Sequence, residues 1–399
     1  MAEKELKWYG TFVPLFGAIL SVADPVTDIL TLVEFYCTDH KTWFGVGLTF
    51  IILPSLFFLL INYVLRWRSD ASRRTWRLND HEESKVEACK FTRVLVFGCN
   101  PLLPAWLKMR TLYSLKKLLK RRQGNNTHQM YGGYSEEEEE LDNLLRFSEL
   151  GVLVEAALES APQFIIQLYA MAVQQQSVSI VQMVSLPVSF LSLAWASTVA
   201  DKTGTLPGNY RRHPYFGVKD TVLLFVTHLF ILSSRLFAVA LFTVSYKWWV
   251  ISVLILHCTV ITICDRVWLR RTHSVYRNNY PFESTIYFCL HWIRDDLTII
   301  HYRYGRDKLL RMQLFSNVLF VIENITMILL FYFSHFPHTW YSLPVTICVC
   351  LFAVLGAVMR LTHFYYSQRR NQTESSSRYS IESPAIAAGL QQYVYETSV

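Results

Sequence analysis

Two stretches decide the fold, V-A-D-P-V-T-D-I-L at residues 22–30 and L-V-E-A-A-L-E-S-A-P-Q-F at residues 153–164. Each places two acidic residues four positions apart inside a long apolar run, Trp8–Val33 in the first case and Leu150–Val173 in the second. Residues four apart share one face of a helix. A charge at mid-membrane depth costs roughly 2.5–3.5 kcal/mol on insertion scales, so such residues face a protein partner, a polar cavity or a transport path. The two stretches therefore predict a polar route through a multi-span membrane protein.

The composition is that of a helical membrane domain. Of 399 residues, 52% are hydrophobic and only 17% are charged, whereas about a quarter of the residues of soluble domains are charged. Several apolar runs reach the ~20 residues that span a bilayer core, and Trp, Tyr, Lys or Arg flank them. We predict an all-α polytopic membrane domain over residues 1–366, in pseudo-halves of about 1–205 and 206–366. A disordered cytoplasmic tail is expected at residues 367–399.

Charge and motif content exclude several classes of protein. The net charge is +7, but the basic residues lie beside the apolar runs, as in cytoplasmic loops, so nucleic acid is not an expected partner. The eight cysteines form no C-x-x-C pair and no zinc spacing, and no nucleotide-binding or hydrolase motif occurs. We therefore expect neither an enzyme nor an ATP-driven pump, and no metal or other cofactor.

The apolar runs predict eight membrane crossings. Two shorter apolar pieces, Phe91–Leu107 and Phe282–Ile293, each precede a dense basic block. A re-entrant segment keeps that block on the cytoplasmic side, together with both termini, whereas ten full crossings are the alternative. Two spans, a hairpin and two spans then occur twice, as in many transport proteins. The predicted crossings are Gly10–Val33, Trp43–Leu65, Leu150–Val173, Val178–Ala200, Val218–Val244, Trp248–Trp268, Leu314–Phe333 and Trp340–Tyr366.

Charged residues inside these spans are the candidates for a functional site. Two uses of such charges are attested, a polar route and a buried ion pair that holds helices together, and we weigh them equally for any one residue. The acids outnumber Arg235 as the basic partner, so the surplus acids need water, a proton or a cationic group such as a lipid amine. The residues concerned are Asp24, Asp28, Glu155, Glu159, Arg235 and Glu323.

Further motifs lie in other predicted spans. S-x-x-W occurs at Ser192–Trp195, R-x-x-A-V-A-L-F at Arg235–Phe242, and F-V-I-E-N-I-T surrounds Glu323. Together with the D-x-x-x-D of the first span and E-A-A-L-E-S-A-P-Q at Glu155–Gln163, they make the chain similar to the XK-related family of multi-span membrane proteins. The resemblance covers about residues 10–366, and its most specific part is E-S-A-P-Q.

This resemblance implies a function in lipid transport. Several members of the family are ATP-independent phospholipid scramblases that expose phosphatidylserine at the plasma membrane, on apoptotic cells that are then engulfed. The resemblance implies eight spans plus two partly inserted helices, with head groups crossing along polar faces to which Gln163 also belongs. The implied partners are membrane phospholipids, a single-span immunoglobulin-type protein and a lipid-transfer protein. The alternative is a non-catalytic scaffold that anchors a lipid-transfer or surface protein.

The tails bear on activation and on partners. Caspase activation, which the resemblance implies for apoptotic members, needs an exposed Asp, and neither Met1–Ala23 nor Tyr365–Val399 contains one. We expect caspases to leave the chain intact or to cut only after Asp142, and phosphorylation of the Ser-rich tail is an alternative trigger. The C-terminal E-T-S-V places Thr397 two residues before Val399, which is the pattern that a PDZ groove binds by strand addition.

Overall fold

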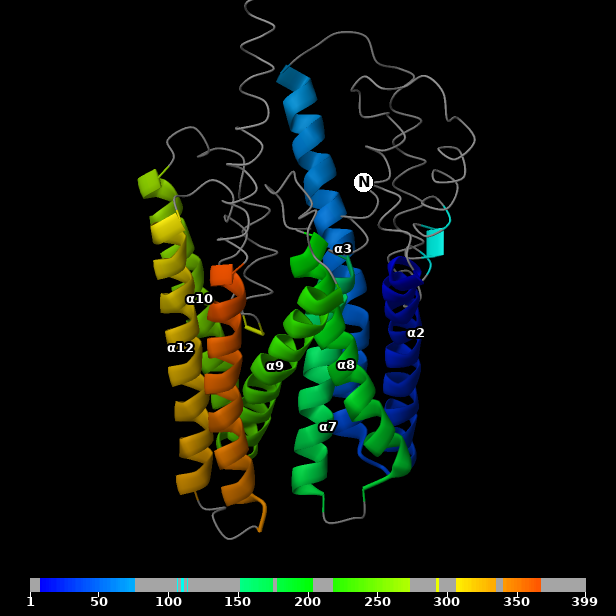
Figure 1. The fold of residues 1–399 in the computed structure, drawn as a ribbon. Helices are drawn as coiled ribbons and strands as arrows, with labels where there is room; N and C mark the ends of the chain where they lie inside the picture. The colour runs from blue at the N-terminus through cyan, green and yellow to red at the C-terminus, as the bar shows by residue number, and fades with distance from the viewer. Residues whose placement is uncertain are drawn as a thin grey trace, which may run out of the picture.

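The computed structural model of the chain describes six stretches, and they are helical almost throughout (Figure 1). Among the described residues there is no β-strand. The described residues are 8–75, 151–174, 178–203, 218–272, 306–334 and 340–366, with Trp106, 109–110, Tyr113 and 292–293.

A helix occupies each of the eight predicted crossings. The third is a single helix over residues 151–173 that contains the π-helical segment η1 (Ala156–Ser160) and continues as α7 (Ala161–Val173). The last is an unlabelled helix, Ser342–Tyr366, called here the C-terminal helix. The others are α2 (Trp8–Cys37), α3 (Lys41–Thr75), α8 (Ile180–Thr203), α9 (Val218–Tyr246), α10 (Trp249–Thr272) and α12 (Arg306–Phe333).

Five of these helices are long and apolar enough to cross a membrane: α2, α8, α9, α12 and the C-terminal helix. In α3 and α10 the apolar stretches are shorter, Lys41–Phe57 and Trp249–Cys264. The chain is therefore a polytopic helical membrane protein, as predicted. The two short apolar pieces predicted to be re-entrant, 91–107 and 282–293, lie almost entirely outside the described residues, and so does the tail 367–399.

The helices run up and down, with tight turns at one end (Figure 1). The α2–α3 and α9–α10 turns contain Asp39 and Lys247, which adopt positive φ angles of 63° and 45°. Exposed aromatic side chains gather in and beside the turns, as in the aromatic belt of a membrane–water interface. They include Tyr36, Trp248, Trp249, Phe333 and Trp340.

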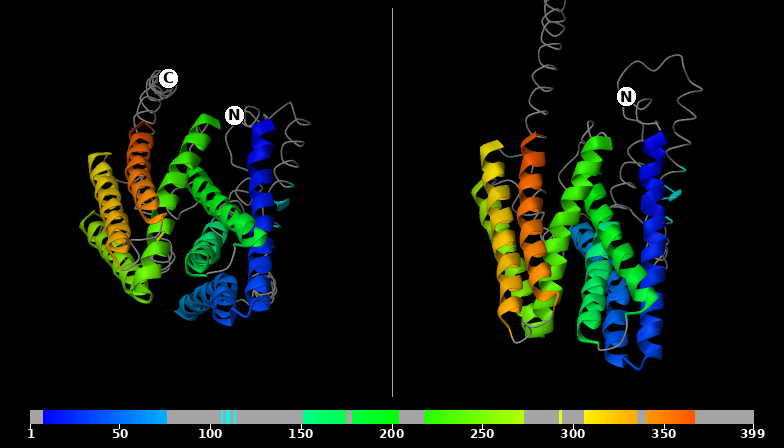
Figure 2. Two further views of the ribbon diagram at one scale, coloured as in Figure 1. Left: turned by 90° about the horizontal axis from the view of Figure 1, so that it is seen from below. Right: turned by 60° about the horizontal axis from the view of Figure 1, so that its bottom comes forward.

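Helix α9 lies at the centre and joins two groups of helices (Figure 2). On one side its Leu232 and Leu236 pack against Leu153, Phe164 and Leu193 from the 151–173 helix and α8. Farther along, the same helix packs against α12 and the C-terminal helix, in a second apolar cluster that includes Phe242, Ile328, Phe331 and Val349.

The outer helices carry apolar side chains on their exposed faces. On α2, exposed Ile19, Val22, Val26 and Leu30 form such a face. Because a bilayer is itself apolar, this is the surface expected to contact lipid tails. The opposite face of α2 is polar and buried, and it leads to the candidate site.

Candidate functional site: a buried polar seam between α2, α7 and α8

The π-helical segment η1 directs two adjacent polar residues inward. Pro162 follows it and has no backbone N–H, so the regular helical ladder cannot continue unchanged. Just before Pro162, the N–H of Ala161 bonds to the carbonyl of Ala156, five residues back. As a result Glu159 and Ser160 are both buried. Segments of this kind occur frequently at functional sites.

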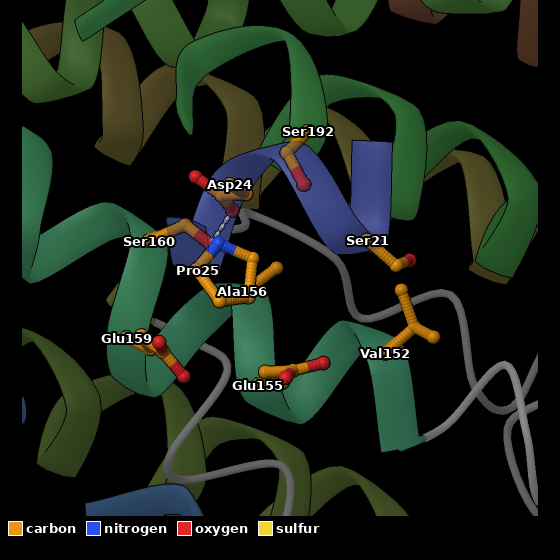
Figure 3. Close-up of a pocket in the computed structure, with 9 residues that line it drawn as sticks. All are labelled: Ser21, Asp24, Pro25, Val152, Glu155, Ala156, Glu159, Ser160 and Ser192. Atoms are coloured by element: carbon orange, nitrogen blue, oxygen red, sulfur yellow. Dashed lines mark hydrogen bonds between the residues drawn. The ribbon is translucent and has the colours of Figure 1, made fainter. Parts of the chain in front are cut away.

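Asp24 lies opposite this segment, on α2. The hydroxyl of Ser160 donates a hydrogen bond to Asp24 Oδ2 at 2.6 Å (Figure 3). Asp24, Glu155 and Glu159 line a small hollow with Ser21 and Ser192 among its other lining residues. Three of the four predicted acids of the N-terminal half are therefore brought together across 131 or more residues of sequence.

Asp28 lies one turn further along α2 and is fully buried, with 0% of its surface exposed. Three side chains donate to its Oδ1 atom: Ser185 and Ser189 at 3.1 Å each, and Gln167 at 3.2 Å. The Gln167 amide nitrogen also lies 2.9 Å from the Ser185 hydroxyl. Two helices, α7 and α8, thus provide neutral donors to one of the two carboxyl oxygens of Asp28.

Polar pairing continues to the end of the bundle where the turns lie. There the hydroxyl of Ser179 donates to Glu34 Oε2 at 2.7 Å, and Gln174 donates to Gln182 at 3.2 Å. From Ser21 to Glu34 the helix rises about 20 Å, two thirds of the ~30 Å of a bilayer core. We call this stripe the polar seam. It comprises Ser21, Asp24, Asp28, Thr31 and Glu34 of α2; Glu155, Glu159, Ser160, Gln167 and Gln174; and Ser179, Gln182, Ser185, Ser189 and Ser192.

Three acids of the seam, Asp24, Asp28 and Glu159, have no described basic partner. Among the described side chains, no Lys, Arg or His forms an ion pair with Asp24, Asp28 or Glu159. One carboxyl oxygen of each, together with Gln167 Oε1, is buried with no hydrogen-bond partner. Within the described part of the chain, these acids are therefore surrounded by neutral hydroxyl and amide groups, in keeping with the surplus of acids expected from the sequence.

Gln163, also a predicted site residue, makes a contact outside the seam. Its amide nitrogen donates to the backbone carbonyl of Gly47 in α3 at 2.7 Å. A Cβ atom added at Gly47 would meet the side chain of Leu32 and lie 3.2 Å from Gln163 Oε1. The contact therefore depends on a glycine, and it fixes α3 against α2 and α7.

Arg235 and Glu323 lie in a second cluster, among α9, α10 and α12. Arg235, with 0% of its surface exposed, places Nη1 3.2 Å from Glu323 Oε2 and donates to Asn324 Oδ1 at 3.0 Å. Its Nε donates to the carbonyl oxygen of Trp292 at 2.8 Å. His257 Nδ1 also contacts the Glu323 carboxylate. These two predicted residues therefore form an ion pair, as in the alternative to a polar route, in which Arg235 is buried and the Glu323 side chain is 15% exposed.

A third group links the two halves of the helix bundle. His228 Nε2 of α9 lies 2.9 Å from Asp201 Oδ2 of α8, and Arg360 of the C-terminal helix lies 4.0 Å from the same oxygen. None of these three was singled out in the sequence, and neither were Gln167 and His257. One signal was available for the seam: Ser185, Ser189 and Ser192 recur at helical spacing in α8.

The part of the chain that the structure describes contains neither a candidate metal cluster nor the predicted PDZ-type tail. Within that part, no group of three or more His, Cys, Asp or Glu side chains could hold a metal ion. The predicted PDZ-type residues Thr397 and Val399 lie outside it, so that site stays a prediction.

Comparison with known proteins relates the chain to one family and to individual members of it. The family model described as XK-related protein matches residues 12–369. A protein of Tetraodon nigroviridis named XK-related protein 9 is 24% identical over 284 residues, which are 67% of this chain and 66% of that protein. The alignment thus spans just under two thirds of that relative's length.

Proposed function

The chain belongs to the XK-related family, and on this premise we propose that it is an ATP-independent phospholipid scramblase. It would expose phosphatidylserine at the plasma membrane, in the setting of apoptosis and engulfment. The proposal includes eight crossings with two partly inserted segments, both termini in the cytoplasm, and membrane phospholipids as the transported molecules.

The polar seam is the observation that carries this proposal. A lipid head group is polar and zwitterionic or charged, so its passage requires polar groups at successive depths of the apolar core. The seam supplies them over about 20 Å of helix. Asp24, Asp28 and Glu159 have no described cationic partner, and they offer carboxyl groups to the amine of a head group.

Because the seam is buried, a lipid head group can reach it only if the helices around it move apart. Hydrogen bonds from Ser160, Ser185 and Ser189 hold α2 against its neighbours and leave Asp28 fully enclosed. A head group therefore needs α2 and α8 to separate, while the acyl chains stay in lipid beside the exposed apolar face of α2. We place the route between α2 and α8.

Reconstitution tests the proposal directly. The full chain, purified and inserted into liposomes with a fluorescent phospholipid, should increase the fraction of lipid that dithionite bleaches, without added ATP. Protein-free liposomes and liposomes that contain heat-inactivated protein are the controls. Bleaching limited to the outer leaflet in the presence of folded protein would contradict the proposal.

A second function, a membrane scaffold, is favoured by the Arg235 cluster. Its ion pair joins α9 to α12, and the bond to the carbonyl oxygen of Trp292 adds a second fixed contact of Arg235. As a scaffold the chain would anchor a lipid-transfer protein or a single-span partner, and a PDZ protein at its C-terminus. Folded protein that captures such a partner but leaves lipid bleaching unchanged would favour this function.

The topology is tested separately. Tags placed at Asn126 and Gly305, in the loops next to the two short apolar pieces, should be labelled only after cells are permeabilised. Labelling of either tag on intact cells would favour ten crossings instead of eight.

A further inference from the structure

We propose that the polar seam is also a proton relay, which passes protons between the two sides of the membrane through its carboxyl and hydroxyl groups. This activity is separate from lipid movement: it needs no separation of α2 from α8, because the groups that would carry the proton already lie within the closed bundle.

Acid groups recur along α2 at intervals that suit a relay. Asp24, Asp28 and Glu34 are separated by rises of about 6 Å and 9 Å along the helix. A hydroxyl group donates to each: Ser160 to Asp24 at 2.6 Å, Ser185 and Ser189 to Asp28 at 3.1 Å, and Ser179 to Glu34 at 2.7 Å. A hydroxyl both donates and accepts, so it can take up a proton on one side as it gives one on the other.

Open acceptor atoms lie in the middle of this series. Asp28 Oδ2 and Gln167 Oε1 belong to fully buried side chains and have no hydrogen-bond partner. Gln167 uses its amide nitrogen for Asp28 Oδ1 and Ser185, which leaves its oxygen as an acceptor beside the acid. A buried carboxyl group without a cationic partner avoids the cost of a charge by binding a proton. The middle of the seam therefore favours a proton over other occupants.

The two ends of the seam are less enclosed than its centre. Glu155 is half-buried beside the hollow that also contains Asp24 and Glu159, and Glu34 is half-buried at the other end. Asp24 and Asp28 between them are buried. Exchange with water is thus favoured at the ends, and transfer between fixed groups in the middle.

The transfer needs no co-reactant. A proton binds a carboxylate oxygen at the Glu155–Glu159 end, and Ser160 donates its own proton to Asp24 while it accepts the next one. Asp24 passes a proton to Asp28 by way of Ser189, whose hydroxyl reaches both acids. Glu34 lies a further rise of about 9 Å along α2, so the relay includes a water molecule that carries the proton from Asp28 and Ser185 to Ser179 and Glu34, from which it leaves. Each O–H bond formed replaces one broken, and the only net change is one proton moved down its gradient.

The test uses the full chain in liposomes that contain a pH-sensitive dye and a potassium gradient. Valinomycin sets a membrane potential that drives protons inward, and the dye reports the rate of acidification. We expect the protein to raise this rate above that of protein-free liposomes, Asp28→Asn to abolish the increase, and Asp28→Glu to retain it. Undiminished flux in Asp28→Asn would overturn the proposal. So would an equal increase in chloride permeability, because a non-selective leak needs no relay.

A milder variant keeps the test decisive if Asp28→Asn does not fold. The double change Ser185→Ala and Ser189→Ala removes two hydroxyls from Asp28 and leaves the acid in place. The matched control is Ser245→Ala, which removes a hydroxyl that lies 2.7 Å from that of Ser334, outside the seam. Slower proton flux only in the seam variant supports the relay, and equal rates in both variants would contradict it.

Lipid bleaching measured in the same liposomes separates this inference from the proposed function. Proton flux without bleaching of inner-leaflet lipid supports the relay and counts against the scramblase. Lipid movement without proton flux supports the scramblase and counts against the relay.

Discussion

The polar seam and the Arg235 cluster hold the same kind of residue, an acid inside a membrane helix, in opposite ways. In the cluster, Glu323 faces a guanidinium and an imidazole, and its charge is balanced within α9, α10 and α12. In the seam, Asp28 faces two hydroxyls and an amide, and no described cation balances it. An acid whose charge is balanced inside the protein stabilises helix packing. An acid satisfied only by neutral donors can still bind a proton or a cationic group, which is what a transport site requires.

The largest expected effect comes from breaking the balanced cluster. Arg235→Gln leaves Glu323 with His257 alone and removes the bond to Trp292, and loss of one partner of a buried pair costs roughly 3–5 kcal/mol. We expect surface expression to collapse, as measured by surface biotinylation. The double change Arg235→Met and Glu323→Leu removes both charges and should recover part of the expression. Normal expression of Arg235→Gln would show that the pair is not structural.

The second largest loss of stability is expected at a glycine contact beside the seam. Gly47→Ala should cost roughly 1–3 kcal/mol, because its Cβ meets Leu32 and Gln163 in a packed contact. Gly45→Ala is the matched control, since a Cβ there meets nothing within 4 Å. Thermal unfolding in detergent should show a lower midpoint for Gly47→Ala only. Equal midpoints would mean that α3 can shift away at little cost.

Neutralising Asp28 in the seam should lower the stability of the fold less than Arg235→Gln or Gly47→Ala does. In Asp28→Asn the side-chain oxygen can still accept from Ser185, Ser189 and Gln167, so we expect stability to change by about 1 kcal/mol or less. Lipid bleaching in liposomes should nonetheless slow. Loss of expression like that of Arg235→Gln would place Asp28 among the structural acids, and undiminished bleaching would remove it from the route.

The smallest expected effect is the coupling between the two regions. The hydrogen bonds and ion pairs described for Asp28 and for Arg235 involve no common residue. Changes that share no partner are additive within about 0.5 kcal/mol. Asp28→Asn combined with Glu323→Gln should therefore lower the unfolding midpoint by the sum of the two single effects. A larger deviation would indicate that the seam and the cluster act as one unit.

Much of this arrangement could be predicted from the sequence. The features that could not be predicted have one cause in common. Apolar runs located the eight long helices of the described part of the chain, because the length and composition of a span are properties of one segment. In contrast, the pairing of Asp24 with Ser160 and the division of the charged residues into two groups are not properties of one segment. They depend on which helix faces which, and the sequence offered Arg235 several acids. The π-helical segment before Pro162 was also missed, since the proline marks a disturbance but not its form.

The separation between Asp24 and Ser160 has a consequence for how the protein is made. The two residues lie 136 positions apart, and synthesis at about 5–20 residues per second puts on the order of ten seconds between them. During that interval α2 is in the membrane with its acids and without the helices that satisfy them. Its first close neighbour is α3, which follows after the short turn at Asp39 and brings no described acid-binding side chain to Asp24 or Asp28. The described groups that bind Asp24 and Asp28 are thus absent when α2 is made, and its polar face is completed only when α7 and α8 arrive.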